Sequence, residues 1–349
     1  MAKPSILTVS RIGHPWATPD PFLFCVYHQD AYPRGNSQLG PDVPLDGRHL
    51  GQDFAGKDGW RMYHGHTVPG FPAHPHRGFE TVTIMRDGYI DHSDSLGASA
   101  RFGRGDVQWL TAGEGIVHSE MFPLLSLNEP NPLELFQIWL NLPKRSKLAR
   151  PYFTMLWSED IPRENIVDSR GAAAGVVTYI AGPPAGRAEP GLPPPPDSWA
   201  SDPTADLAIW TLNLSAGARW TLPPARSGDA RRTLYFFKGA TLVMDGTSIP
   251  VQSSIEVDAA QSIEIANGVS PSELLMLQGR PIGEPVAQHG PFVMNTEQEL
   301  RQAYADYHHS QFGGWPWPDA APVHGAGRGR FARHADGRLE SRSEKGPAG

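Results

Sequence analysis

The chain has 349 residues and a formal net charge of −7, so it offers no net basic charge for binding nucleic acid. Its 37 glycines and 35 prolines make up about a fifth of the residues, which favours short strands and turns over a helical bundle. A single cysteine, Cys25, excludes an intrachain disulfide and a cysteine-rich metal cluster. The sequence shows neither a secretory signal nor a long apolar run, so a cytoplasmic protein with no membrane contact is expected.

The first half of the chain is typical of a β-protein. A strand is predicted at 21–28, and the region 71–121 contains several further β-rich runs. Residues 86–88, with the sequence Arg-Asp-Gly, predict the turn of a hairpin inside that region. The run 133–142 is another candidate for a buried strand, and the proline that follows ends it.

A second block of strands begins near Asp206, and turn-forming residues interrupt it at regular intervals. Between the two blocks, the proline-rich stretch 181–199 predicts extended chain on the surface. Thr296 and Glu299 form a capping box at the start of an amphipathic helix. After Gly313 the composition turns to Gly, Pro, Arg and Ala, which predicts a disordered tail.

Two blocks of short strands with little helix between them predict an all-β protein with two β-barrels or sandwiches in tandem. We expect an N-terminal domain at 1–150 and a C-terminal domain at 205–313. A proline-rich linker at 151–204 would join them, and the tail would occupy 314–349.

Two pairs of side chains have the spacing of a metal site: His74 with His76, and His118 with Glu120. Residues i and i+2 of a strand lie on one face, so both pairs can project into one barrel interior. One such pair alone is more often a surface feature, but two pairs, each inside a predicted strand and about 40 residues apart, favour a metal. Three neutral imidazoles and one carboxylate suit Fe, Mn, Ni, Cu or Zn, and leave two positions open at an octahedral ion.

Other polar residues near these pairs allow two interpretations. Glu80 is either a neighbour or alternative ligand of the metal, or a hydrogen-bonded strand carboxylate. His92 and Asp94 could support the site, although solvated strand residues are the favoured interpretation. His64 and His66 form a third His-x-His pair, but their glycine-rich surroundings favour a loop.

Some residues are expected to have structural roles. A salt bridge or surface position is favoured for Arg77, and packing in the core for Cys25. The second block of strands contains no His-x-His, so no metal is expected there. The Arg-rich tail could touch an acidic partner or nucleic acid, but a solvated tail is favoured and no direct contact with nucleic acid is expected.

Three long segments resemble the pirin family of the cupin superfamily: HPHRGFETVTIMRDGYIDHSDSLG, GRGDVQWLTAGEGIVHSEMF and FQIWLNLPK. The segment GPFVMNTEQELRQAYADY is similar to the closing segment of that family, and the resemblance covers most of residues 20–313. It implies a bicupin, which consists of two tandem antiparallel β-barrel (double-stranded β-helix) domains with a short C-terminal helix. It also implies one mononuclear metal, usually iron, in the N-terminal barrel. The ligands carried over by position are His74, His76, His118 and Glu120. Glu80 lies where a standard cupin has its carboxylate ligand. In pirins the residue at this position is not a ligand.

The resemblance implies two alternative functions. The first is an iron-dependent dioxygenase that cleaves a flavonol such as quercetin with dioxygen, in which other divalent metals could replace iron. There Glu120 would be both a ligand and the acceptor of the flavonol hydroxyl proton. The second is a redox-sensitive regulator that binds a transcription factor or a metabolic enzyme. The open coordination positions favour the enzyme, and a monomer is the family-like expectation. Aromatic residues near the ligands could line a substrate mouth or, more simply, fill the core; they are Phe71, Phe79, Trp109 and Phe122.

Overall fold

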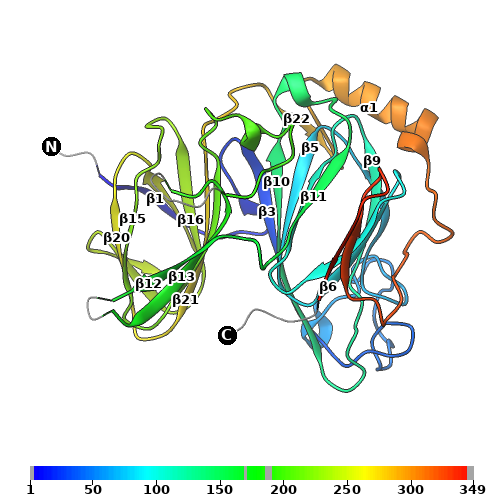
Figure 1. Cartoon of the computed structure of the whole chain (residues 1–349), viewed down its shortest axis with the longest axis horizontal. Helices are drawn as coiled ribbons and strands as arrows, with labels where there is room; N and C mark the ends of the chain where they lie inside the picture. Colours follow the sequence, from blue (N-terminus) through cyan, green and yellow to red (C-terminus); the bar gives the residue numbers. More distant parts are fainter. Residues whose placement is uncertain (1–3, 169–170, 185–190, 344–349) are drawn as a thin grey trace. The chain divides into compact units, whose positions relative to one another are not determined.

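The structure is a computed structural model that describes residues 4–168, 171–184 and 191–343 (Figure 1). Strands dominate it, as the sequence predicts, and α1 (Glu297–Ser310) is the α-helix in this described part. No helix among the described residues has the length and apolar character needed to cross a membrane.

Residue contacts divide the chain into two units, and each unit combines pieces that are distant in sequence. Unit 1 consists of Met1–Cys25 and Asp160–Gly283, and unit 2 consists of Val26–Glu159 and Glu284–Gly349. Domains that are continuous along the chain are expected from the sequence instead. The difference arises because residues near each end of the chain pair with strands far away in sequence, which no local pattern reveals.

Unit 2 contains two antiparallel sheets, which pack through one apolar cluster that includes Met85 and Leu110 from the first sheet and Phe102 and Ile116 from the second. The first has the order β11-β8-β5-β10-β3-β2, where β2 and the start of β3 belong to unit 1. Its strands are β2 (Trp16–Ala17), β3 (Phe22–Tyr32), β5 (Phe79–Asp87), β8 (Val107–Thr111), β10 (Asn131–Asn141) and β11 (Tyr152–Leu156). The second has the order β25-β24-β7-β6-β9-β4. Its strands are β4 (Gly70–His76), β6 (Tyr89–Asp94), β7 (Ser99–Gly103), β9 (Ile116–Met121), β24 (Arg330–Arg333) and β25 (Leu339–Arg342).

The hairpin predicted at residues 86–88 is wrong. β5 pairs with β8 and β10, whereas β6 pairs with β7 and β9, so the two strands belong to different sheets. Gly88 has a φ of 75°, and a Cβ there would lie 2.9 Å from the Pro132 oxygen. This glycine lets the chain turn a tight corner between the sheets, and a corner has the same local turn residues as a hairpin.

Unit 1 contains a seven-stranded sheet and a four-stranded sheet around its own core, in which Leu212 and Ile255 meet Leu242 and Ile263. The first has the order β1-β19-β16-β21-β14-β13-β12. Its strands are β1 (Ile6–Arg11), β12 (Arg163–Val167), β13 (Ala173–Ala181), β14 (Ala208–Leu214), β16 (Arg231–Lys238), β19 (Ser253–Asp258) and β21 (Ser272–Gly279). The second has the order β15-β20-β17-β18. Its strands are β15 (Arg219–Leu222), β17 (Thr241–Met244), β18 (Thr247–Pro250) and β20 (Ile263–Asn267).

The stretch 151–204 is more than a linker, because β11, β12 and β13 lie within it. Valine and isoleucine side chains of β12 and β13 contribute to the core of unit 1, among them Ile166 and Val177. The many prolines near residue 190 therefore mark only the end of this stretch. Residues 185–190 lie outside the described part of the chain.

The C-terminal helix of unit 2 forms as predicted. The Thr296 hydroxyl accepts a hydrogen bond from the Glu299 N–H, as in a capping box, and Leu300 and Ala303 are the buried residues of α1. These two side chains pack with the short hairpin of β22 (Ala287–His289) and β23 (Phe292–Met294).

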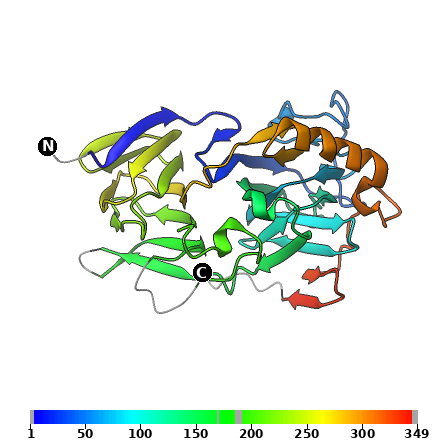
Figure 2. The ribbon, with the colours of Figure 1, turned by 90° about the horizontal axis from the view of Figure 1, so that it is seen from above.

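The predicted disordered tail is wrong for residues 314–343. β24 pairs with β7, and β25 pairs with β24, so the second sheet of unit 2 is two strands wider (Figure 2, red). Arg330 donates a hydrogen bond to Asp106 at 2.7 Å, which ties one of the tail's arginines to a buried carboxylate. The composition of this segment is that of a solvated tail, but Arg330 and Arg338 have acidic partners inside unit 2. The end of the expected tail, residues 344–349, lies outside the described residues.

Candidate metal centre

Two adjacent strands carry the candidate ligands. In the register of β4 and β9, His74 lies opposite His118 and His76 lies opposite Ile116. Paired residues share a face of the sheet and so do residues two apart, so His74, His76, His118 and Glu120 all project to one side. The same face carries the apolar Ile116 of the unit 2 core, which places the four side chains inside that unit.

The three histidines converge. Their candidate ligand atoms all lie within 4.8 Å of one another, a spacing suited to one metal ion. The ring centroids are 4.5 Å apart for His74 and His118, 4.8 Å for His74 and His76, and 4.9 Å for His76 and His118.

Backbone carbonyls orient two of the rings. The Nδ1 atom of His74 lies 2.8 Å from the Pro72 oxygen, and that of His76 lies 3.4 Å from the Pro291 oxygen. A carbonyl oxygen only accepts, so each Nδ1 carries the proton and each Nε2 keeps its lone pair. His118 is different, because both of its ring nitrogens are buried without a hydrogen-bond partner. A buried ring nitrogen without a hydrogen-bond partner costs free energy, and binding a metal ion would offset this cost. The state of His118 is therefore the one expected of a metal ligand.

Burial also keeps the rings neutral. It lowers the pKa of His74 to about 4, and it lowers the pKa of His76 and of His118 well below the usual range. Repulsion among the neighbouring imidazoles adds to this effect for His76 and His118. A neutral imidazole is the form that binds a metal, so the cluster needs no deprotonation at neutral pH.

Glu120 lies beside the histidines, with its Oε2 atom 3.9 Å from Nε2 of His118. The Gln137 amide donates to the same oxygen at 2.8 Å, whereas Oε1 is buried without a partner. Burial raises the pKa of Glu120, and the bond from Gln137 partly offsets this. Gln137 is not among the residues predicted from the sequence. Its only signal is that it is polar within the otherwise apolar run 135–140 of β10.

His92 and Asp94 are buried, so the favoured interpretation of solvated strand residues is wrong. His92 lies opposite Glu120 in the register of β6 and β9, and its ring centroid is 5.5 Å from that of His118. Its Nε2 atom is 3.1 Å from the Asp94 carboxylate. The pair therefore lines the same interior as the three clustered histidines.

Glu80 does not face the cluster. The Thr111 hydroxyl donates to its carboxylate at 2.7 Å. Along β5, Phe79 and Thr83 share the other face: the ring of Phe79 contacts His76, and Thr83 pairs with Gln137. Strand alternation continued from His74 and His76 would put Glu80 on their face, but Gly78, with a φ of 85°, turns the chain between β4 and β5, which belong to different sheets. The interpretation of a hydrogen-bonded strand carboxylate is therefore the one the contacts bear out.

The remaining candidates have the expected structural positions. His64 and His66 are exposed in the loop before β4, and Nδ1 of His64 contacts the Gly51 oxygen. Arg77 forms a salt bridge of 2.6 Å with Asp306 of α1. Cys25 is fully buried, as a packing residue is expected to be.

The aromatic residues divide between the site and the core. Phe71 has its ring centroid 6.3 Å from that of His74, and Phe79 lies 5.1 Å from His76. Phe122 contacts Phe71 at 6.0 Å. Trp109 pairs with Val82 of β5, on the sheet face opposite to Phe79 and Thr83. Phe71 and Phe79 thus contact the clustered histidines, and Phe122 packs against Phe71.

Two units of paired antiparallel sheets, one with a histidine cluster inside it, define a bicupin. Comparison with known proteins gives the same class. The family model "Pirin" matches residues 50–140, and "Pirin C-terminal cupin domain" matches residues 209–313. The chain belongs to the pirin family.

Relatives support this assignment over most of their length. A Pseudomonas aeruginosa protein named "Putative quercetin 2,3-dioxygenase" is 35% identical over 245 residues, which are 70% of this chain and 79% of that protein. A pirin-like protein of Solanum lycopersicum is 36% identical over 68% of this chain and 75% of its own. A crystal structure of quercetin 2,3-dioxygenase from Acinetobacter baumannii has a TM-score of 0.69 at 23% identity, covering 90% of this chain and 99% of that one. This structure confirms the bicupin fold.

Proposed function

We propose that this protein is a metal-dependent dioxygenase that cleaves a flavonol such as quercetin, with one iron ion held by His74, His76, His118 and Glu120. The observation that carries the proposal is the buried, partnerless state of both His118 nitrogens beside two oriented imidazoles. The relative from Pseudomonas aeruginosa supports the reaction class.

The three imidazoles and the carboxylate suit a divalent first-row metal better than they suit a hydrogen-bonded network in a protein core. His74 and His76 would bind through Nε2, because their Nδ1 atoms contact carbonyls. Three nitrogens and one carboxylate oxygen leave open positions on an octahedral ion, which suits a metal that must also meet a substrate. Bound iron would lower the pKa of the flavonol hydroxyl and hold the flavonolate beside dioxygen.

Glu120 would take the hydroxyl proton of the substrate. Its Oε1 atom has no partner, whereas Gln137 holds Oε2, so the carboxylate has one oxygen fixed and one available. This role requires an oxygen within reach of the hydroxyl rather than an unusual pKa. Burial of the site excludes water, which protects a reactive ring-opening step.

The test is aerobic quercetin decay by iron-reconstituted protein, followed by loss of flavonol absorbance beside His118→Ala. We expect decay in the wild type and none in the variant, in which iron binding is also lost. His66→Ala, an exposed loop histidine, serves as the matched control and should keep full activity. An unchanged absorbance in wild type with iron bound would overturn the dioxygenase proposal, and the regulator hypothesis would then be preferred.

A further inference from the structure

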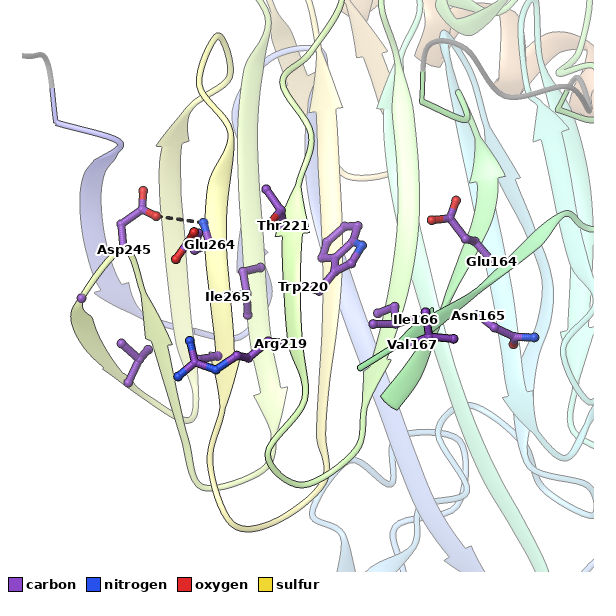
Figure 3. A pocket seen from close by; sticks show the side chains of 13 residues that line it. Glu164, Asn165, Ile166, Val167, Arg219, Trp220, Thr221, Asp245, Glu264 and Ile265 are labelled. Carbon is purple, nitrogen blue, oxygen red and sulfur yellow. Dashed lines mark hydrogen bonds between the residues drawn. The ribbon is translucent and has the colours of Figure 1, made fainter. Parts of the chain in front are cut away.

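A cavity of about 660 Å³ lies in unit 1 beside β12 and β15, but its polar side chains do not converge (Figure 3). Glu164 already accepts a hydrogen bond from the Tyr179 hydroxyl at 2.8 Å. Glu264 lies opposite Thr221 in the register of β15 and β20, and Thr221 is the neighbour of Trp220 along its strand. Neighbouring residues of a strand point to opposite faces, so Glu264 and Trp220 do not share one surface. This cavity therefore lacks the convergent polar groups of a ligand site.

In unit 2 the candidate metal centre is exposed on the side of His74. This histidine keeps part of its surface exposed, whereas His76 and His118 are buried. Phe71 lies on the same side, with its ring centroid 6.3 Å from that of His74. It pairs with Glu120 in the register of β4 and β9, so its side chain shares the inner face of the sheet with the candidate ligands. Phe71 therefore borders the exposed side of the centre.

The long loop between β3 and β4, residues 33–69, brings further rings to this side. The ring of His64 lies edge-on to Phe71, with centroids 5.8 Å apart, and edge-on to Phe54, with centroids 5.0 Å apart. His64 is exposed, and Phe54 is 49% exposed. Phe54, His64 and Phe71 thus form a continuous aromatic row from the surface to His74. Loops of this length are uncommon in compact domains, and ordered ones usually have a function.

Tyr63 supports the aromatic row. It is buried, and its ring centroid lies 5.0 Å from that of Phe71 and 5.6 Å from that of Phe54. Its hydroxyl donates to the Asp30 carboxylate of β3 at 2.6 Å and lies 2.8 Å from Nδ1 of His28 on the same strand. Its φ of 56° is unfavourable for an aromatic residue, and backbone strain of this kind clusters at functional sites. The loop is therefore held firmly against β3, which fixes the rings of the row.

His64 provides the row with a hydrogen-bond acceptor. Its Nδ1 atom lies 2.7 Å from the Gly51 oxygen, and its backbone N–H donates to the Gly70 oxygen at 3.0 Å, at the start of β4. A carbonyl oxygen only accepts, so Nδ1 of the neutral ring carries the proton and Nε2 keeps its lone pair. Within the described part of the chain Nε2 has no partner. This nitrogen is therefore available to a hydroxyl group of a ligand.

We propose that the aromatic row holds the part of the substrate that lies away from the metal, and that this part is a planar ring with a hydroxyl group that donates to Nε2 of His64. The proposal rests on the dioxygenase function proposed above. Planar rings pack well against other rings, and a neutral imidazole nitrogen accepts from a phenol but not from an unsubstituted ring. His64 is thus a specificity-determining residue that favours polyphenols over flavonols with a single hydroxyl group.

The experiment is an anaerobic titration of the full-length, iron-loaded protein with quercetin and with 3-hydroxyflavone, followed by the change in flavonol absorbance. Both compounds carry the 3-hydroxyl group, but only quercetin has hydroxyl groups on its outer rings. Without dioxygen neither compound is consumed, so the titration measures binding alone. We expect quercetin to bind about three- to tenfold more tightly, which is the contribution of one hydrogen bond.

Variants locate this hydrogen bond. His64→Phe keeps a ring in the row but removes the acceptor, so it should weaken quercetin about three- to tenfold and leave 3-hydroxyflavone unchanged. His64→Gln provides an acceptor again and should recover part of the loss. His66→Phe makes the same exchange at an exposed histidine of the same loop, and this matched control should bind both flavonols as wild type does. Phe54→Leu removes a ring, so it should weaken both flavonols to a similar extent.

Three outcomes would overturn the proposal: no binding of either flavonol, equal affinities of the wild type for the two, or an equal loss for both in His64→Phe. Thermal unfolding midpoints show whether each variant folds, and His64→Ala replaces His64→Phe in the test if that variant does not. The dioxygenase proposal fails separately. If quercetin binds through His64 but is not consumed in air, only the reaction is wrong. If quercetin is consumed with an unchanged KM in His64→Phe, only the role of His64 is wrong.

Discussion

Gln137 is the side chain that fixes Glu120. Its amide donates to Oε2 at 2.8 Å, and the two side chains come from facing sheets. In Gln137→Leu the carboxylate loses this bond, so its pKa should rise further and its orientation should be less well defined. We expect the affinity for iron(II) to fall about 10- to 100-fold while all three histidines are intact. Competition with a chromophoric chelator measures this change.

Gln108 offers a matched control for that experiment. Thr83 of β5 pairs with Gln137 of β10 on one side and with Gln108 of β8 on the other. The amide nitrogen of Gln108 has no hydrogen-bond partner. Gln108→Leu should therefore leave the affinity for iron unchanged. Equal losses in the two variants would mean that packing, rather than the hydrogen bond to Glu120, accounts for the effect.

Acid should destabilise the metal-free protein through the histidine cluster. Burial keeps the imidazoles neutral in the folded state, with the pKa of His74 lowered to about 4, while in the unfolded chain they take up protons near pH 6.5. The unfolded state therefore binds more protons as the pH falls from 7 to 5, and the free energy of unfolding decreases. His118→Gln removes one of these groups, so its urea midpoint should fall less steeply with pH. Parallel declines for wild type and variant, measured with a chelator present, would contradict this assignment.

The sequence predicts that His74, His76 and His118 lie together, but it does not predict which side chains surround them. His74, His76 and His118 follow from two i, i+2 pairs, because strand alternation acts over a few residues. Gln137 is invisible to that reasoning, since its partner Glu120 is on another sheet. Glu80 shows the limit of alternation itself: one glycine of positive φ, Gly78, reverses the face on which later residues lie.

Lys147 joins three elements of unit 2. It is buried, and its ammonium donates to the Gly78 oxygen at 2.7 Å, to the Val293 oxygen at 3.1 Å and to the Asn141 side chain. These acceptors lie in the turn after β4, in β23 and at the end of β10. Lys147→Met would leave all three buried without this donor, so we expect a loss of about 2–4 kcal/mol in the free energy of unfolding.

Lys144 lies in the same turn and is exposed, which makes Lys144→Met the matched control, with a change within about 0.5 kcal/mol. Urea unfolding at pH 7 compares the two. Similar midpoints for both variants would show that the buried ammonium does not stabilise the fold.

Elements were easier to predict than their pairing. The strands, the helix and its cap follow from local patterns, whereas the partner of a strand depends on contacts across the whole chain. At Gly88 the same turn residues serve a corner between sheets instead of a hairpin. In β24 and β25 an arginine-rich composition suggests disorder, yet Arg330 meets Asp106, which lies more than two hundred residues earlier in the chain.

At the scale of the whole molecule, unit 2 is completed by a segment that lies beyond all of unit 1 in sequence. β24 supplies a neighbour for β7, and Arg101 on β7 is fully buried, with its guanidinium bound to Asp91 and to the carbonyl oxygens of His324, Gly325 and Arg328. A fragment of residues 1–150 lacks this segment and exposes that ion pair. We therefore expect the fragment to lack cooperative unfolding and ordered tertiary structure.

A fusion protein shows whether the fragment fails to fold because it lacks the C-terminal segment or because it is shortened. Joining residues 26–159 to residues 284–343 through a flexible linker restores every strand of the second sheet, together with Lys147 and its acceptors. This fusion should unfold cooperatively and bind one iron ion per chain, because the histidine cluster lies wholly within unit 2. Near-ultraviolet circular dichroism and metal analysis compare the fusion with the fragment. Cooperative unfolding of the 1–150 fragment would show instead that the continuous domain is the folding unit. The C-terminal segment would then be an addition to a sheet that is already stable without it.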